Sequence, residues 1–483
     1  MAAAQRSPLW RVKPIHHILK QAGQGEGHSL KRTLTVTSIT AMGIGAIVGT
    51  GIFVLTGVAA ANYAGPGLIL SFVLAAVVSG LAAICYAEFA STVPIAGSAY
   101  TYSYATLGEL IAWIIGWDLI LEYAVGAAAV SIGWSGYVAD LLKGALGITL
   151  PTALISSPFS GGIINLPAFL IILFITLLLI VGTSESSRVN NIIVAIKLAV
   201  ILFFLAVGFG HVNPAHWTPF LPFGTGGIFR GASIIFFAYI GFDQISTSAE
   251  EARNPARDLP IGIMVSLLIC TMLYILVTAV LTGMVSYTQL NVASPVSHAL
   301  ILLGMNTAGS IISVGAIAGL TTVLLVLLYG QSRIFFSMSR DGLLPTFFSR
   351  IHPRFRTPYL SSLLVGLVVA LVAALTPIDV VAELTNIGTL AAFVLVAVGV
   401  LVLRRKQPDL HRAFRVPLVP WLPILSIIGS IVLIVSLPLV TILRFLVWLA
   451  LGLILYFTYS RHKSRLASTE SQSSELSEAS TES

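Results

Sequence analysis

The residue of this chain that most clearly could do chemistry is Lys197, which lies within the apolar run NNIIVAIKLAVILFF. It sits about eight residues into that run, or roughly 12 Å along a helix that rises 1.5 Å per residue. At such depth a lysine costs about 2.5 to 3.5 kcal/mol on insertion scales, and it marks a functional position by default. A buried amine can lose and regain a proton, so we expect Lys197 to act as a proton carrier that is charged in one part of a functional cycle and neutral in another. The alternative is a structural lysine that stays permanently paired.

Carboxylates also fall inside or beside apolar segments. Asp118 and Glu122, in GWDLILEY, are one helical turn apart and therefore share a face. We expect Glu122 to share the proton with Lys197 or to tune it, and the alternative is a structural partner for a nearby hydroxyl or backbone group. Asp243 follows a second apolar segment, where it is expected to cap a helix or line a pathway. Glu88 is expected to be a gate or loop charge that pairs with arginine.

Two glycine-containing weak points interrupt the apolar segments that surround these groups. One is the run GIGAIVGTGIF over residues 43–53, and the other is AYIGF over residues 238–242. Non-helical backbone survives at membrane depth only where protein or a water-lined cavity receives it, because an unpaired backbone group in lipid costs several kcal/mol. Paired breaks of this kind indicate the substrate site of a secondary transporter. The alternative is that Gly45 and Gly49, spaced as GxxxG, only allow tight helix packing.

The composition of the chain indicates the class of protein to which it belongs. The chain has 483 residues, 57% of them hydrophobic and 9% charged, with a mean hydropathy of +0.96. Such values indicate an all-α integral membrane protein, since the apolar runs do not alternate as β-barrel strands do. About twelve segments are long enough to span a membrane: residues 35–61, 66–90, 107–139, 166–182, 190–210, 228–248, 260–285, 307–331, 359–376, 382–403, 418–437 and 442–459.

The loops between these segments carry an asymmetric charge. Most of the 26 Lys and Arg fall in the two termini and in alternate loops, whereas Lys143, Arg230 and Arg444 fall on the other side. Because positive charge is retained in the cytoplasm, we expect both termini there, in a multi-pass protein of the plasma (inner) membrane. The net charge of +7 reflects this topology, so nucleic-acid binding is not expected. Cys85 and Cys270 fall inside spans and indicate no disulfide or metal framework.

The positions of the two breaks predict an internal repeat. We expect a cytoplasmic segment over 1–32 and a transporter core over 33–404, with repeat one at about 33–210 and repeat two at about 226–404. Two additional transmembrane helices should follow over 405–460. A Ser/Glu-rich tail over 461–483 is expected to be disordered and cytoplasmic.

Several motifs along the chain resemble one known family. The run GIGAIVGTGIF, FFAYIGFD at 236–243, EEARNPARDLP at 250–260 and SRDGLLP at 339–345 together resemble the amino acid-polyamine-organocation superfamily. YAEFASTVPIAGSAYTYSY at 86–104 and GWDLILEY at 116–123 are similar to its cationic amino acid transporter branch and bacterial homologues. The resemblance implies a LeuT-like fold, in which a five-plus-five inverted repeat with discontinuous helices 1 and 6 is joined by two extra helices.

The resemblance also implies roles for individual residues. Gly49, Thr50 and Gly51 would hold a substrate carboxylate through backbone N–H groups and the threonine hydroxyl, as polar helix ends hold anions. The carbonyls of Ile47 and Ile240 would receive the substrate ammonium.

Three further roles follow from the same resemblance. Phe237 would close over the substrate as a gate, with lipid contact or core packing as the alternative. Leu327 would flank the substrate side chain and favour a small neutral one. Lys197 would replace the sodium ion of sodium-coupled relatives and, when charged, tie the first span to the fifth.

The function expected from these features is import of small neutral L-amino acids such as alanine, by proton symport with alternating access. A cationic (Arg/Lys) transporter and an amino acid exchanger remain alternatives, and an amino acid sensor is the alternative outside transport. No catalytic or metal constellation indicates an enzyme, and no filter motif indicates a channel. No cofactor is expected besides the proton. The partners expected are the amino acid and membrane lipids, with a monomer or weak oligomer, and docking of a small single-helix accessory subunit stays open.

Overall fold

The computed structural model describes residues 11–12, 34–92, 98–182, 187–245, 252–410, 412 and 414–465, which form helices joined by loops. The principal helices are α2 (Val36–Ile47), α4 (Leu68–Thr92), α5 (Ser98–Thr106), α6 (Glu109–Leu146), α8 (Leu166–Val181), α9 (Ser187–Phe209), α10 (Gly224–Ile235), α12 (Pro255–Met284), α13 (Pro295–Leu302), α14 (Asn306–Arg340), α15 (Tyr359–Leu375), α16 (Ile378–Lys406), α17 (Trp421–Val435) and α18 (Leu439–Leu455). The shorter turns used below are η2 (Gly51–Leu55), α3 (Thr56–Ala59), η3 (Ala60–Ala64), α7 (Thr152–Ile155), η7 (Phe236–Tyr239), α11 (Phe242–Ile245) and α19 (Arg461–Lys463).

Every one of the twelve apolar segments contains a helix, but fewer of these helices could cross a membrane unaided. Seven stretches within the described residues are long and apolar enough: Gly51–Phe89, Glu109–Leu146, Ile192–Phe209, Arg257–Met284, Asn306–Arg340, Ile378–Lys406 and Leu439–Lys463. Four shorter apolar helices, α2, α8, α15 and α17, have 12 to 17 residues. The protein is therefore a multi-pass membrane protein, and four of its apolar helices are shorter than the about 20 residues of a typical span.

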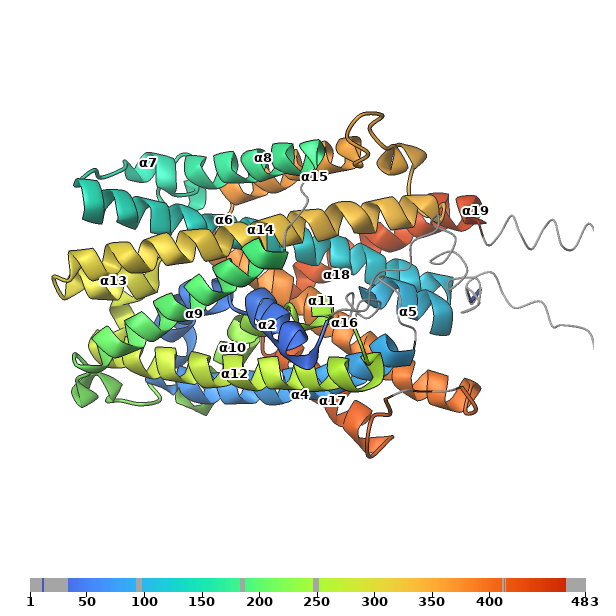
Figure 1. The fold of residues 1–483 in the computed structure, drawn as a ribbon, viewed down its shortest axis with the longest axis horizontal. Coiled ribbons are helices and arrows are strands. Elements are labelled where there is room, and N and C mark those ends of the chain that lie inside the picture. Colours follow the sequence, from blue (N-terminus) through green and yellow to red (C-terminus); the bar gives the residue numbers. More distant parts are fainter. Residues whose placement is uncertain are drawn as a thin grey trace, which may run out of the picture.

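The long helices run side by side along the length of the molecule (Figure 1). The central helix α6 packs against both α14 and α16, while α12 packs against α4 and α2 and α15 packs against α8. Small residues let α6 approach its neighbours closely. A Cβ built on Gly133 would lie 2.4 Å from Val54 Cγ2, and one built on Gly136 would lie 2.7 Å from Ala293 Cβ. Close backbone approach of this kind is the usual basis of helix association in lipid.

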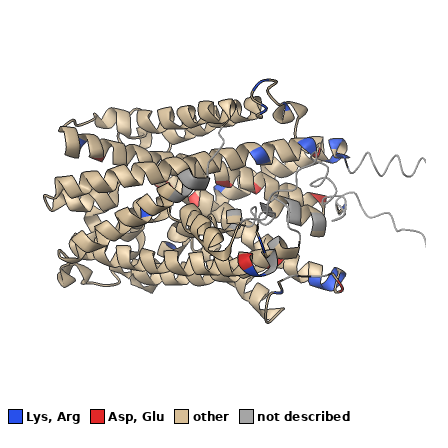
Figure 2. Cartoon of the chain, in the orientation of Figure 1, with Lys and Arg blue, Asp and Glu red and all other residues tan. Residues whose placement is uncertain are grey.

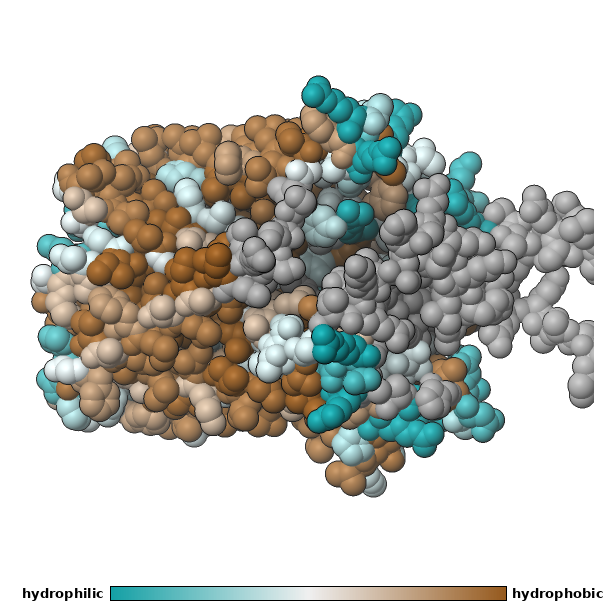
Figure 3. Space-filling view, viewed as in Figure 1, coloured by the Kyte–Doolittle hydropathy of each residue, from teal (hydrophilic) through white to brown (hydrophobic). Residues whose placement is uncertain are grey.

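Charge and hydropathy divide the molecule along its length. Lys, Arg, Asp and Glu gather at the end that carries α19, while α7 and α13 mark the opposite end (Figure 2; Figure 1). We call the charged end the basic end. Apolar side chains cover most of the face seen in Figure 3 away from that end. Outer helices such as α18 expose large apolar residues, including Val447 at 61% and Leu451 at 54%.

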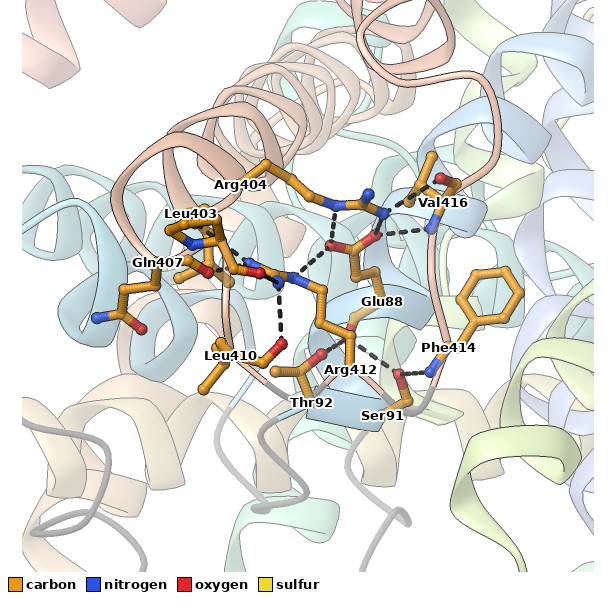
Figure 4. Close-up of polar contacts among 11 residues, drawn as sticks. Glu88, Ser91, Thr92, Leu403, Arg404, Gln407, Leu410, Arg412, Phe414 and Val416 are labelled. Carbon is orange, nitrogen blue, oxygen red and sulfur yellow. Dashed lines mark hydrogen bonds and ion pairs between the residues drawn. The ribbon is translucent and has the colours of Figure 1, made fainter.

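A buried ion cluster joins three elements at the basic end (Figure 4). Glu88 of α4 accepts from Arg404 Nε at 3.0 Å, from Arg404 Nη2 at 2.7 Å and from the Val416 N–H at 2.7 Å. Arg412 Nε lies 3.3 Å from the same carboxylate. The Arg412 guanidinium also donates to the carbonyls of Leu403, Gln407, Pro408 and Leu410. The expected pairing of Glu88 with arginine is thus confirmed, and the cluster fixes the end of α16 and its following loop to α4.

Both described ends of the chain meet at the first residue of α6. The Glu109 N–H donates to the Arg11 carbonyl at 2.9 Å, and the Ser464 hydroxyl donates to the Glu109 carboxylate at 2.5 Å. Of the predicted segment 1–32 and tail 461–483, only residues 11–12 and 461–465 are described, and the short helix α19 lies within the latter. Within the described residues, the chain therefore enters and leaves the bundle at the basic end.

Candidate functional site

The first predicted break lies between α2 and η2. Helix α2 ends at Ile47, and Val48 is extended with φ −73° and ψ 102°. Helical geometry resumes at Thr50 and continues as the π-helical turn η2 from Gly51. The change of direction leaves the last carbonyls of α2 without partners in their own helix.

The second predicted break lies between α10 and α11. After α10 the chain tightens into the 3₁₀ turn η7, and Ile240 is then extended with ψ 139°. Gly241 has φ +118°, which only glycine adopts readily, before α11 begins at Phe242. The weak point AYIGF therefore interrupts its helix as the sequence predicted.

The two breaks touch each other. A Cβ built on Gly51 would lie 2.1 Å from Ala238 Cα, and one built on Gly241 would lie 2.8 Å from the Ala46 carbonyl oxygen. Backbone therefore meets backbone at the centre of the molecule. The alternative packing role also has support for the first glycines, since a Cβ on Gly45 would lie 2.5 Å from Val194 Cγ2 of α9.

Two side chains donate hydrogen bonds to the carbonyls at the breaks. Lys197 Nζ of α9 donates to Gly45 O at 2.9 Å and to Val48 O at 3.1 Å. The Tyr274 hydroxyl of α12 lies 2.8 Å from Ile47 O and 2.8 Å from Ala238 O, so it contacts one carbonyl from each break. A hydroxyl has one proton, so it can donate fully to only one of them. The Ile47 carbonyl keeps a second lone pair for another donor.

Lys197 is almost completely enclosed, with 2% of its surface exposed. Its aliphatic stem passes α14, where a Cβ built on Gly319 would lie 3.0 Å from Lys197 Cε. Its hydrogen bonds go to backbone carbonyls, and no ion pair to an acidic residue is present among the described residues. The predicted tie between the first span and α9 is therefore present in the structure, whereas its role in proton coupling stays a prediction.

A cavity of about 790 Å³ lies beside the two breaks. All seven residues predicted to bind substrate line it: Ile47, Gly49, Thr50, Gly51, Phe237, Ile240 and Leu327. Thr50 is 1% exposed, and its Oγ1 has no hydrogen-bond partner within the part of the chain that the structure describes. A buried hydroxyl without a partner is costly unless a ligand supplies one.

Phe237 and Leu327 meet at a glycine of the central helix. A Cβ built on Gly126 of α6 would lie 3.7 Å from Phe237 Cε2, 3.7 Å from Leu327 Cδ1 and 3.6 Å from Thr385 Cγ2. Four elements, α6, η7, α14 and α16, thus converge beside the cavity. Gly126 is not among the residues that line the cavity, but a methyl group there would be in ordinary contact with all three side chains, and the sequence did not indicate this position.

None of the acidic residues singled out in the sequence is among the described residues that line the cavity. Glu122 is 3% exposed on α6 and is not among the residues that line the cavity. Asp118 is 1% exposed, and its Oδ1 has no partner among the described residues. No described hydrogen bond or ion pair joins either carboxylate to Lys197. The side chain of Asp243 lies outside the described part of the chain.

The end of the bundle opposite the basic end is held together by hydrogen bonds from the first span. Tyr63, in η3, donates to Glu383 Oε1 of α16 at 3.2 Å, and Thr441 of α18 donates to the other carboxylate oxygen of Glu383. The Asn62 amide donates to Asn291 Oδ1 at 3.0 Å. The cavity instead extends along α14 toward the basic end, as far as Arg340.

The sequence is similar to those of several known transport proteins. A family model described as Amino acid permease matches residues 34–458. The chain is 53% identical over 466 residues to a branched-chain amino acid permease of Bacillus subtilis, covering 95% of this chain and 99% of the relative. It is 50% identical over 462 residues, covering 95% and 99%, to a methylthioribose transporter of the same organism. A vacuolar cationic amino acid transporter 4 of Arabidopsis thaliana is 40% identical over 399 residues, covering 81% and 66%.

The contact between the breaks can be tested through Gly51→Ala. The added Cβ would overlap Ala238 Cα, a backbone atom that cannot rotate away, so we expect a loss of about 2 kcal/mol or more and a lower Tm of the purified protein. The matched control is Gly80→Ala in α4, whose added Cβ would meet only Leu267 Cδ2 at 3.7 Å. Equal Tm values for the two variants would contradict the contact.

Proposed function

The chain belongs to the amino acid permease family, as its motifs indicated, and we propose that it imports neutral amino acids by proton symport with alternating access. The observation that carries this proposal is the contact between two helix breaks whose polar backbone lines one cavity. Discontinuous helices at mid-membrane are where secondary transporters hold substrate. A sensor without transport has no need of a cavity that continues from its ligand site to one end of the bundle.

The chemistry of the cavity matches a zwitterion. A carboxylate can accept from the unpartnered Thr50 hydroxyl and from N–H groups of the turn that starts η2, where the helix dipole is positive. An ammonium can donate to the carbonyls of Ile47 and Ile240, two residues that line the cavity. Phe237 would then cover the bound amino acid.

The residues that line the cavity favour a neutral side chain. They include Phe237, Leu327, Val323 and Val326 but no Asp or Glu among the described residues. A cationic side chain would lack a partner there, and desolvating an unpaired charge is costly. We therefore favour neutral substrates, from alanine to the branched-chain amino acids named for one relative. Transport of cationic amino acids and of methylthioribose, named for two other relatives, are the competing outcomes.

Coupling to protons is proposed to act through Lys197. The charged amine holds Gly45 O and Val48 O and so fixes the end of α2. Charge-assisted hydrogen bonds are about twice as strong as neutral ones, so loss of the proton would loosen α2 from α9. Asp118 and Glu122 are candidate carboxylates to bind the proton after it leaves Lys197, because both are buried in α6. No cofactor or metal is needed for this cycle.

The proposed topology follows from the basic end. Because positive charge is retained in the cytoplasm, we place the basic end and both termini there, in the plasma (inner) membrane. The cavity then faces inward, and the Tyr63–Glu383 bond closes the outside. Twelve spans would form a five-plus-five inverted repeat, with α17 and α18 as the two extra helices. We expect a monomer or weak oligomer, with or without a small accessory helix.

The proposed function predicts uptake by the purified protein in liposomes. Labelled leucine, alanine, arginine and methylthioribose would be offered with and without an inward proton gradient, and then with sodium. We expect leucine and alanine to accumulate when the outside is acidic, and sodium to have no effect. Arginine or methylthioribose uptake without leucine uptake would contradict the proposed substrate class. Uptake that requires internal amino acid and ignores pH would show an exchanger.

A second prediction concerns Lys197→Ala. The variant loses the charged tie between α2 and α9, so proton-driven accumulation of leucine should fall at least about tenfold, because two charge-assisted bonds are lost. The control is Lys143→Ala, because Lys143 is exposed in the last turn of α6 and does not line the cavity. Normal proton-dependent uptake by Lys197→Ala would remove Lys197 from the mechanism.

A third prediction concerns the size of the side-chain space. Gly126→Ala adds a methyl group in ordinary contact with Phe237, Leu327 and Thr385, so the fold should tolerate it while the space shrinks. One methylene of misfit is worth about 1 to 3 kcal/mol. Leucine uptake should therefore fall about tenfold relative to alanine uptake, measured as the ratio of kcat/KM values. Gly80→Ala is the control, and an unchanged ratio in Gly126→Ala would place the side chain elsewhere.

A further inference from the structure

Helix α14 carries a repeated pair of residues beyond the candidate substrate site. In each pair, an aromatic residue is followed one helical turn later by an arginine. The two pairs are Tyr329 with Arg333 and Phe336 with Arg340. Each guanidinium lies over its own ring, with Arg333 Cζ 4.9 Å and Arg340 Cζ 5.9 Å from the ring centroids. The two pairs are seven residues apart and therefore lie on the same face of the helix. We call them the arginine ladder.

All four residues of the ladder line the cavity that also contains Thr50 and Phe237. Arg333 is six residues beyond Leu327, or about 9 Å along the helix, and Arg340 is about 20 Å beyond it. The ladder thus covers the part of the cavity between the two breaks and the basic end.

The guanidinium groups are available to a ligand. Neither Arg333 nor Arg340 has a hydrogen bond or an ion pair with any residue that the structure describes, and both side chains are exposed to the cavity. The nearest acidic residue in sequence, Asp341, accepts from the Tyr100 hydroxyl at 2.8 Å. Stacking on a ring leaves the N–H groups at the edge of the guanidinium plane, where a carboxylate can accept two of them.

The position of Arg333 differs from that of the ordinary topology-setting charges. Arg350, Arg354 and Arg356 lie in the loop after α14, where cytoplasmic arginines are expected. Arg333 instead lies two turns inside the helix, where a charge is expensive unless it faces a water-filled path. Because Arg333 lines the cavity without a described counter-charge, its guanidinium is available to pair with an anionic group there.

We propose that the arginine ladder is a second, transient site for the substrate carboxylate on the way to the cytoplasm. This inference rests on the proposed function, because it concerns the exit of the same amino acid. On release, the carboxylate leaves Thr50 and the η2 turn, binds Arg333 between the breaks and the basic end, and passes to Arg340. The ammonium leaves the carbonyls of the breaks at the same time, and no acidic residue lines the described part of the cavity between the breaks and the basic end to bind it. The inward-facing state therefore holds amino acid through its carboxylate alone.

The test compares the two faces of the membrane for Arg333→Gln in liposomes, with orientation assigned by a protease-accessible tag. KM for leucine is measured for uptake from the outer face and for efflux from the cytoplasmic face. Loss of one charge-assisted contact should raise the cytoplasmic KM about tenfold relative to the outer KM. Arg350→Gln removes a cytoplasmic charge outside the cavity and should leave the ratio of the two KM values unchanged.

Two analogues of leucine identify the group that binds. 4-Methylpentanoate, which lacks the amine, should inhibit efflux from the cytoplasmic face in the unaltered protein and about tenfold less in Arg333→Gln. 3-Methylbutylamine, which lacks the carboxylate, should act equally on both. Internal chloride that inhibits as well as the acid would show a general anion site and overturn the carboxylate assignment. An unchanged KM ratio in Arg333→Gln would overturn the ladder, whereas absence of leucine uptake by the unaltered protein would overturn the proposed function.

Discussion

Backbone polar groups in a low-dielectric interior must be satisfied, and this constraint organises the centre of the molecule. Lys197 donates to the carbonyls of Gly45 and Val48 at the end of α2, and the Tyr274 hydroxyl lies within hydrogen-bond distance of the carbonyls of Ile47 and of Ala238 in η7. Residues of both breaks line the cavity, together with Thr50, whose buried hydroxyl has no hydrogen-bond partner among the described residues. In the proposed function, the breaks offer their remaining donors and acceptors to the substrate.

In the proposed substrate site, backbone groups take the place of charged side chains. Backbone N–H and carbonyl groups are held by the fold and need no reorganisation when a zwitterion arrives. They also recognise only the part that all amino acids share. In the proposed function, selection among amino acids comes from the apolar wall around Phe237 and Leu327, which both lie beside Gly126. Two relatives that are named for different substrates are 53% and 50% identical to this chain, which is consistent with a fixed polar centre and a variable wall.

The sequence predicted the two breaks, because glycine runs inside apolar segments have a direct physical meaning. It also predicted that Ile47, Thr50, Phe237 and the other binding candidates would lie together, and all of them line one cavity. It did not identify Tyr274, since a tyrosine within an apolar helix carries no signal of which carbonyl it will meet. Nor could it show that Glu122 lies away from the cavity lining, because that depends on how α6 is rotated against its neighbours.

We propose that the touching helix breaks hold an amino acid through main-chain groups, and a structure of the protein with bound L-leucine would test this. We expect the leucine carboxylate within hydrogen-bond distance of Thr50 Oγ1 and the N–H groups of residues 49–51, with the ammonium at the carbonyls of Ile47 and Ile240. Leucine bound away from both breaks, or a helix wound without interruption through Val48, would contradict it.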